Sequence, residues 1–399
     1  MNTEKPVFNV TNAIRDFMRL ESAGGLILLA AAILALLVAN SPLSALYASF
    51  LDTPIGVRVG ALAIDKPLIL WVNDGLMAIF FFLIGLEIKR EVIEGELSSI
   101  SQVVLPGVGA LGGMLVPAGI YLWINAGDAD AVNGWAIPVA TDIAFALALL
   151  SVFGKRVPIG LKVFLLTLAI FDDLAAIIII AVFYSGDISI LALTIGAAIL
   201  ILAIILNRIG VSRTSAYVLL GIALWVAMLK SDVHATSAGV LIAFCVPIRD
   251  QKGDSPLREM EHDLHGPVAF AILPIFAFAN AGLALGGIAL SDLTSPITLG
   301  VILGLVAGKP IGILLFVGLA VMLKLARLPL NVNWPQVLGV AFACGIGFTM
   351  SLFIAGLAFT PSADGGISGD RLGVLVGSIA SAIAAYVILR FSLPKTAPD

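Results

Sequence analysis

The chain has 399 residues, of which 60% are hydrophobic and only 12% carry a charged side chain. Its mean hydropathy of +1.10 excludes an ordinary soluble globule and is typical of membrane proteins with many spans. The net charge of −4, without a long basic run, excludes nucleic acid as a partner.

Twelve apolar segments follow one another along the chain, and we interpret them as membrane-spanning helices. The first lacks a small-residue cleavage site and is followed by many more, which favours a span over a signal peptide. No linker suggests a second domain, so residues 1–399 are predicted to form one all-α transmembrane domain. The predicted spans are 24–40, 68–88, 103–124, 132–152, 159–184, 189–207, 214–229, 233–248, 267–289, 298–323, 336–359 and 372–391.

Positive charge is distributed unevenly between the two sides that these spans define. Of the 22 Lys and Arg residues, 17 fall on the side of the N-terminus, four on the opposite side and one inside a span. Because short loops rich in Lys and Arg stay in the cytoplasm, both termini are predicted to be cytoplasmic.

Between the first two spans, apolar residues alternate along Ile55–Ile64 around Gly60, which predicts a short β-hairpin. A lone hairpin is marginally stable in water. Pairing with the hairpin of a second copy and a loosely ordered loop therefore both remain open.

Charged residues gather at the cytoplasmic end of the second span and again just before the ninth. Histidine changes its charge near physiological pH, so the two groups together are candidates for sensing cytoplasmic pH. Ordinary solvated span ends are the alternative. The candidates are Glu87, Arg90, Glu91, Glu261, His262 and His265.

The fourth span is predicted to be interrupted. Pro138 removes a backbone donor just before Thr141 and Asp142. A broken helix at membrane depth requires partners for the freed backbone groups. Thr141 and Asp142 are predicted to cap a half-helix, and local capping without a transport role is the alternative.

The fifth span carries two adjacent aspartates, Asp172 and Asp173, near its middle. An aspartate at the centre of a span costs roughly 2.5–3.5 kcal/mol on insertion scales, so a pair indicates a cation or proton path. Adjacent helix positions lie about 100° apart, so the two carboxylates are expected to have different partners and roles. Structural aspartates that cap buried backbone are the alternative.

Lys309 is the cation in the middle of the tenth span, and it should face a carboxylate. A purely structural ion pair is the alternative to a transport role. The glycines of Cys344–Gly347 interrupt the eleventh span. Two broken helices suggest inverted repeats, approximately 103–184 and 298–391, with a site near the middle of the membrane.

Cysteine and histidine are scarce. Cys245 and Cys344 lie in apolar segments, which argues against a disulfide framework. The three histidines and two cysteines show no metal-site spacing, and we expect no cofactor.

Several motifs together resemble the NhaA-type sodium/proton antiporters of bacteria, over about residues 12–391. The motifs are FFLIGLEIKREV, ATDIAFALALL, LAIFDDLAAI, LPIFAFANAG, AGKPIG and GIGFTMSLFI. The resemblance implies twelve spans with crossed, interrupted fourth and eleventh helices in the bacterial inner membrane. It also implies electrogenic exchange of two protons for one sodium ion, with lithium accepted.

The resemblance also assigns roles to residues. Asp173 matches the principal sodium and proton carboxylate, and Asp172 the second essential aspartate, which pairs with Lys309. Whether Asp172 or Lys309 carries the second proton stays open. Thr141 and Asp142 match the interrupted helix, where the aspartate offsets helix-end dipoles. The charged cluster matches the family's pH-responsive group, and the hairpin matches its homodimer contact.

Three other classes are less well supported by the sequence. A cation channel requires a continuous polar pore, whereas the ionisable residues here occupy a few positions within the spans. A sodium-coupled symporter should show more aromatic or amide residues near the broken helices. An intramembrane aspartyl protease needs a glycine–aspartate motif, which GIGF lacks. We therefore expect a secondary transporter in contact with membrane lipid, and not an enzyme.

Overall fold

The computed structural model describes residues 10–60, 62–95, 97, 100–185, 189–286, 288–359 and 369–394. Within these ranges the chain forms helices and one small sheet. In chain order the elements are α1 (Val10–Ala39), α2 (Ser44–Leu51), β1 (Pro54–Val59), β2 (Leu62–Pro67), α3 (Leu68–Leu70), η1 (Trp71–Leu76), α4 (Met77–Glu94), α5 (Ile100–Ile124), η3 (Ala131–Val139), α6 (Ile143–Ser151), η4 (Gly154–Arg156), α7 (Ile159–Phe183), α8 (Ile190–Arg208), α9 (Thr214–Ser231), α10 (Ser237–Ala243), α11 (Pro256–Pro267), η5 (Val268–Ile272), α12 (Leu273–Asn280), α13 (Leu290–Leu293), α14 (Pro296–Leu303), η6 (Gly304–Gly308), α15 (Lys309–Met322), α16 (Trp334–Cys344), α17 (Phe348–Ala358) and α18 (Gly369–Ser392).

The helices are long and apolar enough to cross a membrane, which confirms the predicted class. Within the described ranges nine helical segments meet this condition, and two bent pairs raise the number to eleven. Helices prevail because the hydrocarbon core offers no water, so each segment must satisfy its own backbone hydrogen bonds. The predicted count of twelve is not confirmed exactly.

The predicted span 233–248 accounts for the difference. Its regular helix, α10, has only seven residues. The backbone after it is not left without partners, because Lys89 Nζ donates to the carbonyls of Phe244 and Val246. Asn207 Nδ2 donates to the carbonyl of Cys245 at 2.7 Å. Side chains from α4 and α8 thus replace the helical hydrogen bonds that a longer α10 would make.

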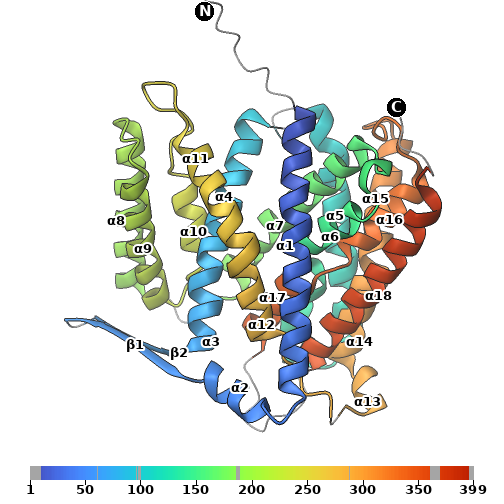
Figure 1. Ribbon diagram of the computed structural model, residues 1–399, viewed down its shortest axis with the longest axis horizontal. Coiled ribbons are helices and arrows are strands. Elements are labelled where there is room, and N and C mark those ends of the chain that lie inside the picture. The colour runs from blue at the N-terminus through green and yellow to red at the C-terminus, as the bar shows by residue number, and fades with distance from the viewer. Residues whose placement is uncertain are drawn as a thin grey trace, which may run out of the picture.

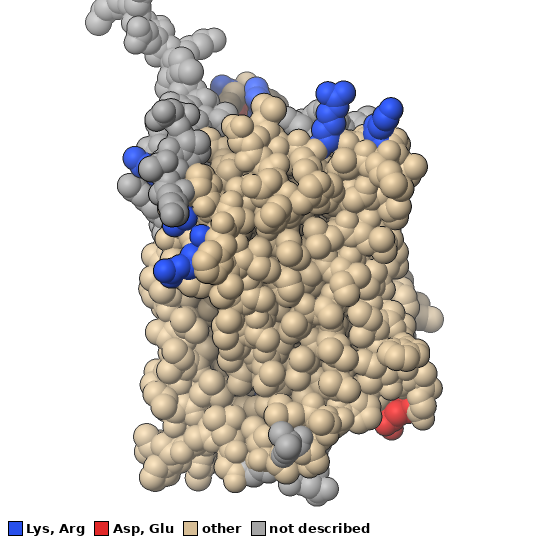
Figure 2. Space-filling model, turned by 90° about the vertical axis from the view of Figure 1, so that its right-hand side faces the viewer, with Lys and Arg blue, Asp and Glu red and all other residues tan. Residues whose placement is uncertain are grey.

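The start of α1 and the end of α18 lie at the same end of the molecule, and the hairpin, α2 and α13 lie at the opposite end (Figure 1). On the face in Figure 2, Lys and Arg side chains gather toward one end, and a broad band below them carries no charged side chain. Such an apolar band is what a bilayer requires of a surface in contact with it.

The predicted hairpin is present and longer than the sequence indicates. Strands β1 and β2 pair antiparallel, with Ile55 opposite Lys66 and Val57 opposite Ile64. Trp71 Nε1 donates to the carbonyl of Ile55 at 3.1 Å, and Lys230 Nζ donates to that of Ala63 at 2.7 Å. These two bonds connect the hairpin to the start of the second span and to α9.

Helices α5 and α15 pack with their backbones in direct contact. A Cβ atom built on Gly312 would lie 2.0 Å from the carbonyl oxygen of Gly112, a distance at which no side chain fits. Glycine is therefore required at this crossing, and it lets the two helices approach closely. This contact matters for the site because Lys309 begins α15.

We predict that Gly312→Ala lowers the free energy of unfolding by at least 1–3 kcal/mol, roughly the cost of overpacking a core, because the backbone of Gly112 cannot yield easily. Gly318→Ala, in the same helix with open space around it, is the matched control and should be neutral or stabilising. Thermal unfolding in detergent micelles measures both variants. Equal stability of the two would contradict the close crossing.

Candidate functional site

The two predicted helix interruptions are present, and they meet. Helix η3 ends at Val139 and α6 begins at Ile143, while α16 ends at Cys344 and α17 begins at Phe348. The amide of Asp142 donates to the carbonyl of Ile346 at 2.7 Å. Helix α17 packs on η3, and α16 contacts α6. Each half of one broken span therefore lies beside a half of the other.

The carboxylate of Asp142 caps two helices at once. Its Oδ1 accepts from the amide of Phe145 at 3.1 Å, in the first turn of α6. Its Oδ2 accepts from the amide of Thr349 at 3.0 Å, in the first turn of α17, and from the hydroxyl of Thr349. Because a helix N-terminus carries partial positive charge, one negative side chain stabilises both ends. The geometry shows the predicted cap for Asp142, whereas the hydroxyl of Thr141 contacts Asp172 and the carbonyl of Cys344 instead.

Helix α17 needs this cap from elsewhere because its own N-cap residue is Gly347. A Cβ atom on Gly347 would lie 2.1 Å from Ser351 Oγ and 3.1 Å from the carbonyl oxygen of Ala140. No residue with a capping side chain fits there. Glycine at the break in the eleventh span and aspartate at the break in the fourth are therefore complementary.

Asp172 and Lys309 form a fully buried ion pair beside these breaks. Lys309 Nζ lies 2.6 Å from Asp172 Oδ2, and both side chains are 0% exposed. Lys309 Nζ also donates to the carbonyl of Val139, the last residue of η3. Thr141 Oγ1 lies 2.6 Å from Asp172 Oδ2 and 2.8 Å from the carbonyl oxygen of Cys344. Each buried charge thus has several partners, which offsets the desolvation of the pair.

Asp173 has a different environment from its neighbour, as the helical spacing predicts. It is 2% exposed, and within the described ranges its Oδ2 has no hydrogen-bond partner. It lines a cavity of about 50 Å³ together with Thr141, Asp142 and Thr349. At roughly 10–15 Å³ per water, this space holds a few water molecules or a cation that has lost most of its hydration shell.

The same cavity extends toward the charged cluster. Glu87 and His265 belong to its lining, together with apolar residues of α4 and η5. His265 Nδ1 lies 3.9 Å from Glu87 Oε1. The cavity therefore joins the carboxylate in the middle of the membrane to two of the residues predicted to sense pH.

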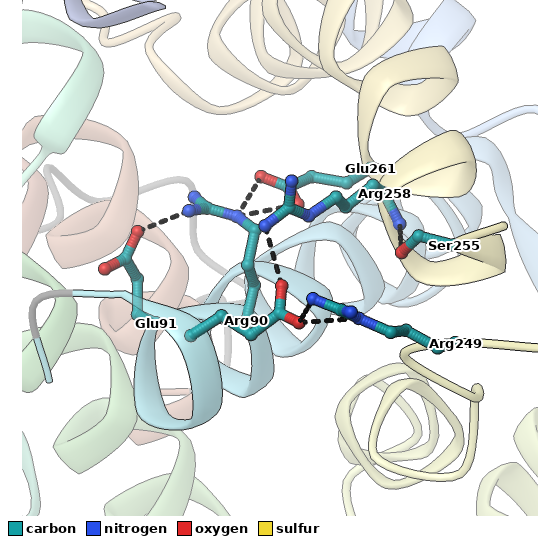
Figure 3. A network of polar contacts seen from close by, with 7 residues as sticks. Arg90, Glu91, Arg249, Ser255, Arg258 and Glu261 are labelled. Atoms are coloured by element: carbon teal, nitrogen blue, oxygen red, sulfur yellow. Dashed lines mark hydrogen bonds and ion pairs between the residues drawn. The ribbon is translucent and has the colours of Figure 1, made fainter. Parts of the chain in front are cut away.

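The rest of the charged cluster connects α4 to α11, as Figure 3 shows. Arg90 lies between two carboxylates, with Nε 2.9 Å from Glu261 Oε2 and one terminal nitrogen 2.7 Å from Glu91 Oε1. His262 belongs to the predicted cluster but is exposed on α11, and in the described part of the chain it makes no hydrogen bond or ion pair with these groups.

The sequence analysis missed a second group beside this one. Glu94, at the end of α4, accepts from Arg249 at 2.9 Å and from Arg258 at 2.6 Å. The two arginines come from the loop before α11 and from α11 itself (Figure 3). The signal available was the charged end of the second span, although nothing in the pattern paired Glu94 with that distant loop.

The sequence model of a family described as Na+/H+ antiporter 1 matches residues 15–389. The chain is 58% identical over 385 residues to the "Na(+)/H(+) antiporter NhaA" of Shewanella sp. (strain W3-18-1), covering 96% of this chain and 98% of that protein. It is 54% identical over 388 residues to the "Na(+)/H(+) antiporter NhaA 1" of Pseudomonas putida KT2440, covering 97% and 98%.

A solved structure resembles the fold. It is that of the sodium proton antiporter MjNhaP1 from Methanocaldococcus jannaschii at pH 8, with a TM-score of 0.52 over 95% of this chain and 96% of that one. At 14% sequence identity the likeness concerns the fold alone.

We predict strong energetic coupling between Asp172 and Lys309. Lys309→Met should lower the free energy of unfolding by roughly 3–5 kcal/mol, because it leaves the Asp172 carboxylate buried without its counter-ion. The double variant Lys309→Met/Asp172→Leu should lose less than the sum of the two single variants. Chemical unfolding in detergent micelles measures all three.

The ion pair of Lys66 and Asp74 is the matched control for this cycle. Its two atoms lie 2.9 Å apart, but its side chains are 33% and 16% exposed. Solvent screening should keep its coupling at about 1 kcal/mol or less. Coupling of the same size in both pairs would contradict the predicted effect of full burial.

Proposed function

The chain belongs to the Na+/H+ antiporter 1 family, and we propose that it exchanges two protons for one Na+ or Li+, electrogenically and under the control of cytoplasmic pH. As a member of this family it is a transporter with many spans in the inner membrane, and Na+ and H+ are its substrates. The stoichiometry, the acceptance of Li+, the residue roles and the pH response belong to the proposal.

Competition for Asp173 carries the exchange. A carboxylate binds either a proton or a cation, so arrival of one substrate releases the other. The observation that supports this role most directly is the cavity, because it combines a buried carboxylate oxygen that has no partner in the described part of the chain with room for one cation stripped of most of its water. Asp142, whose oxygens are committed to two helix ends, supplies fixed negative charge and is not the exchanging group.

The pair of Asp172 and Lys309 supplies the second proton of the cycle. Their contact at 2.6 Å in a fully buried site means that gain or loss of one proton changes the partners of both groups. Whether the proton resides on the carboxylate or on the amine, its movement adds a charge that the sodium ion does not balance. The net charge that moves in each cycle couples exchange to the membrane potential, about 2.3 kcal/mol per 100 mV.

The charged cluster controls access to the cavity in this proposal. Arg90 and Glu261 join α4 to α11, and Glu87 and His265 line the cavity beside them. A proton gained by His265 places positive charge 3.9 Å from Glu87 and in the path of an entering cation. Cation entry should therefore be favoured when the cytoplasm is alkaline.

Orientation and assembly complete the proposal. The excess of Lys and Arg on one side supports cytoplasmic termini, with the hairpin outside. The repeats 103–184 and 298–391 would then move relative to the other helices to expose Asp173 to each side in turn. Two hydrogen bonds connect the hairpin to Trp71 and Lys230, which supports a role as the contact of a homodimer in the lipid bilayer.

We predict that Asp173→Asn abolishes proton movement driven by cations. The amide keeps the volume of the side chain, but it does not bind a proton at physiological pH and does not carry the negative charge that attracts a cation. The protein is reconstituted in liposomes, lumenal pH is followed with a fluorescent dye, and Na+, Li+ and K+ are added in turn. Wild type should respond to Na+ and Li+ and not to K+.

Asp74→Asn is the matched control for that variant. Asp74 is a carboxylate in another span, away from the cavity, and pairs with Lys66. This variant should transport like wild type. Transport at the wild-type rate in Asp173→Asn would contradict the assignment of Asp173 as the exchanging carboxylate. Absence of any response to Na+ in the wild-type protein would contradict the antiporter proposal.

A further prediction tests the stoichiometry. With equal pH on both sides, exchange of two protons for one Na+ is at equilibrium when a tenfold Na+ gradient is opposed by a membrane potential of about 60 mV. The reason is that a tenfold gradient corresponds to about 1.4 kcal/mol, the free energy of moving one charge across that potential. A valinomycin and potassium gradient sets the potential, and the dye reports the Na+ gradient at which net proton flux vanishes. If the Na+ gradient at zero net proton flux did not change with the membrane potential, the exchange would be electroneutral, with one proton for one Na+.

A further inference from the structure

The oxygen atoms around the cavity are of two kinds, those already committed to other partners and those that are free. Both carboxylate oxygens of Asp142 accept hydrogen bonds, and Asp172 Oδ2 accepts from Lys309 and lies against Thr141. Within the described ranges, Asp173 Oδ2 and Asp172 Oδ1 are buried carboxylate oxygens without a hydrogen-bond partner, but of these two residues Asp173 alone lines the cavity. One such oxygen is too few for a small hard cation, which prefers several oxygen ligands.

Thr349 brings another oxygen to this cavity. It is 2% exposed, and it lines the cavity together with Asp173. Its hydroxyl donates its only proton to Asp142 Oδ2. A hydroxyl has one donor and two acceptor lone pairs, so the oxygen of Thr349 keeps its acceptor capacity. Donation to a carboxylate also polarises the hydroxyl and makes its oxygen a better acceptor.

The backbone around Thr349 suits a cation rather than repelling it. Helix α17 begins at Phe348, and its N-terminal partial positive charge would disfavour a cation nearby. However, the amide of Thr349 is bound by Asp142 Oδ2, and the amide of Phe348 donates to Ser378 Oγ at 3.1 Å. With these two amides committed, the hydroxyl oxygen of Thr349 is a hard ligand that the first turn of α17 offers to the cavity, which Met350 of the same turn also lines.

We propose that Thr349 Oγ1 is a ligand of the transported cation, and that it favours Na+ over Li+. This inference rests on the proposed antiport at Asp173 and adds a specificity residue to it. A larger cation accommodates more oxygen ligands than a smaller one of the same charge, as Ca²⁺ does relative to Mg²⁺. Removing one oxygen should therefore weaken the binding of Na+ more than that of Li+.

The test compares Thr349→Val with Thr349→Ser in liposomes. Valine keeps the branched shape and the backbone amide on Asp142 but lacks the hydroxyl, whereas serine retains it. Thr349→Val should raise the KM for Na+ about tenfold, the lower end of what loss of one supporting group costs a metal site. The KM for Li+ should rise less, and the maximal rate should change little. In Thr349→Ser both KM values should stay close to those of the wild type.

Ser351→Ala is the matched control. Ser351 is a buried hydroxyl on the same helix, and it donates to the carbonyl of Ile137 at 2.7 Å without lining the cavity. It should keep the wild-type ratio of the two KM values. If Thr349→Val does not fold, Thr349→Ala, with its thermal stability measured with and without each cation, gives the same comparison.

Two results would overturn the ligand role while leaving the antiporter intact. One is a wild-type KM for Na+ in Thr349→Val. The other is an equal rise of both KM values with lower thermal stability, which would mean that Thr349 only holds Asp142 in place. Absence of any cation-driven proton movement in wild type would instead overturn the proposed function itself.

Discussion

The absence of water at membrane depth is the constraint on which this structure depends, because each break in a helix there leaves backbone groups that need partners. The two breaks satisfy each other: the amide of Asp142 binds the carbonyl of Ile346, and the carboxylate of Asp142 binds amides at the start of α6 and α17. Lys309 Nζ donates a hydrogen bond to the carbonyl of Val139. The side chains that complete the backbone are thus the ionisable residues for which we propose a role in transport, so stability and the proposed chemistry depend on the same atoms.

This shared use divides the labour among three carboxylates in one small region. Asp142 is held at two helix ends and keeps a fixed environment. Asp172 is held by Lys309. Asp173 retains an oxygen without a partner in the described structure and lines the cavity, and for this reason we propose it as the carboxylate that exchanges one substrate for another. Neighbouring positions on one helix suffice to separate the last two, because a turn of about 100° directs them to different surroundings.

The sequence predicted the parts of this site that depend on residue type within a span. The presence of charge in apolar segments indicated Asp142, Asp172, Asp173 and Lys309. The resemblance to a known family implied that Asp172 pairs with Lys309. It could not predict backbone partners such as the carbonyl of Val139, which any residue type would supply, nor the pairing of Glu94 with arginines from a distant loop. The shortness of α10 was not predicted for a similar reason: an apolar pattern indicates burial, but it does not show that Lys89 and Asn207 on other helices bind the carbonyls that follow α10.

The direct contact between the backbones of Gly112 and Gly312 has a mechanical consequence. The side chains of Val116 and Phe316 pack closely around this contact, so a change of rotamer alone would not let one helix slide past the other. Lys309 stands at the start of α15, and α7, which carries Asp172, also packs on α5. The two helices that hold the ion pair, α7 and α15, therefore both pack on α5. Separation of Asp172 and Lys309 without breaking this packing would therefore depend on the flexible side chain of the lysine.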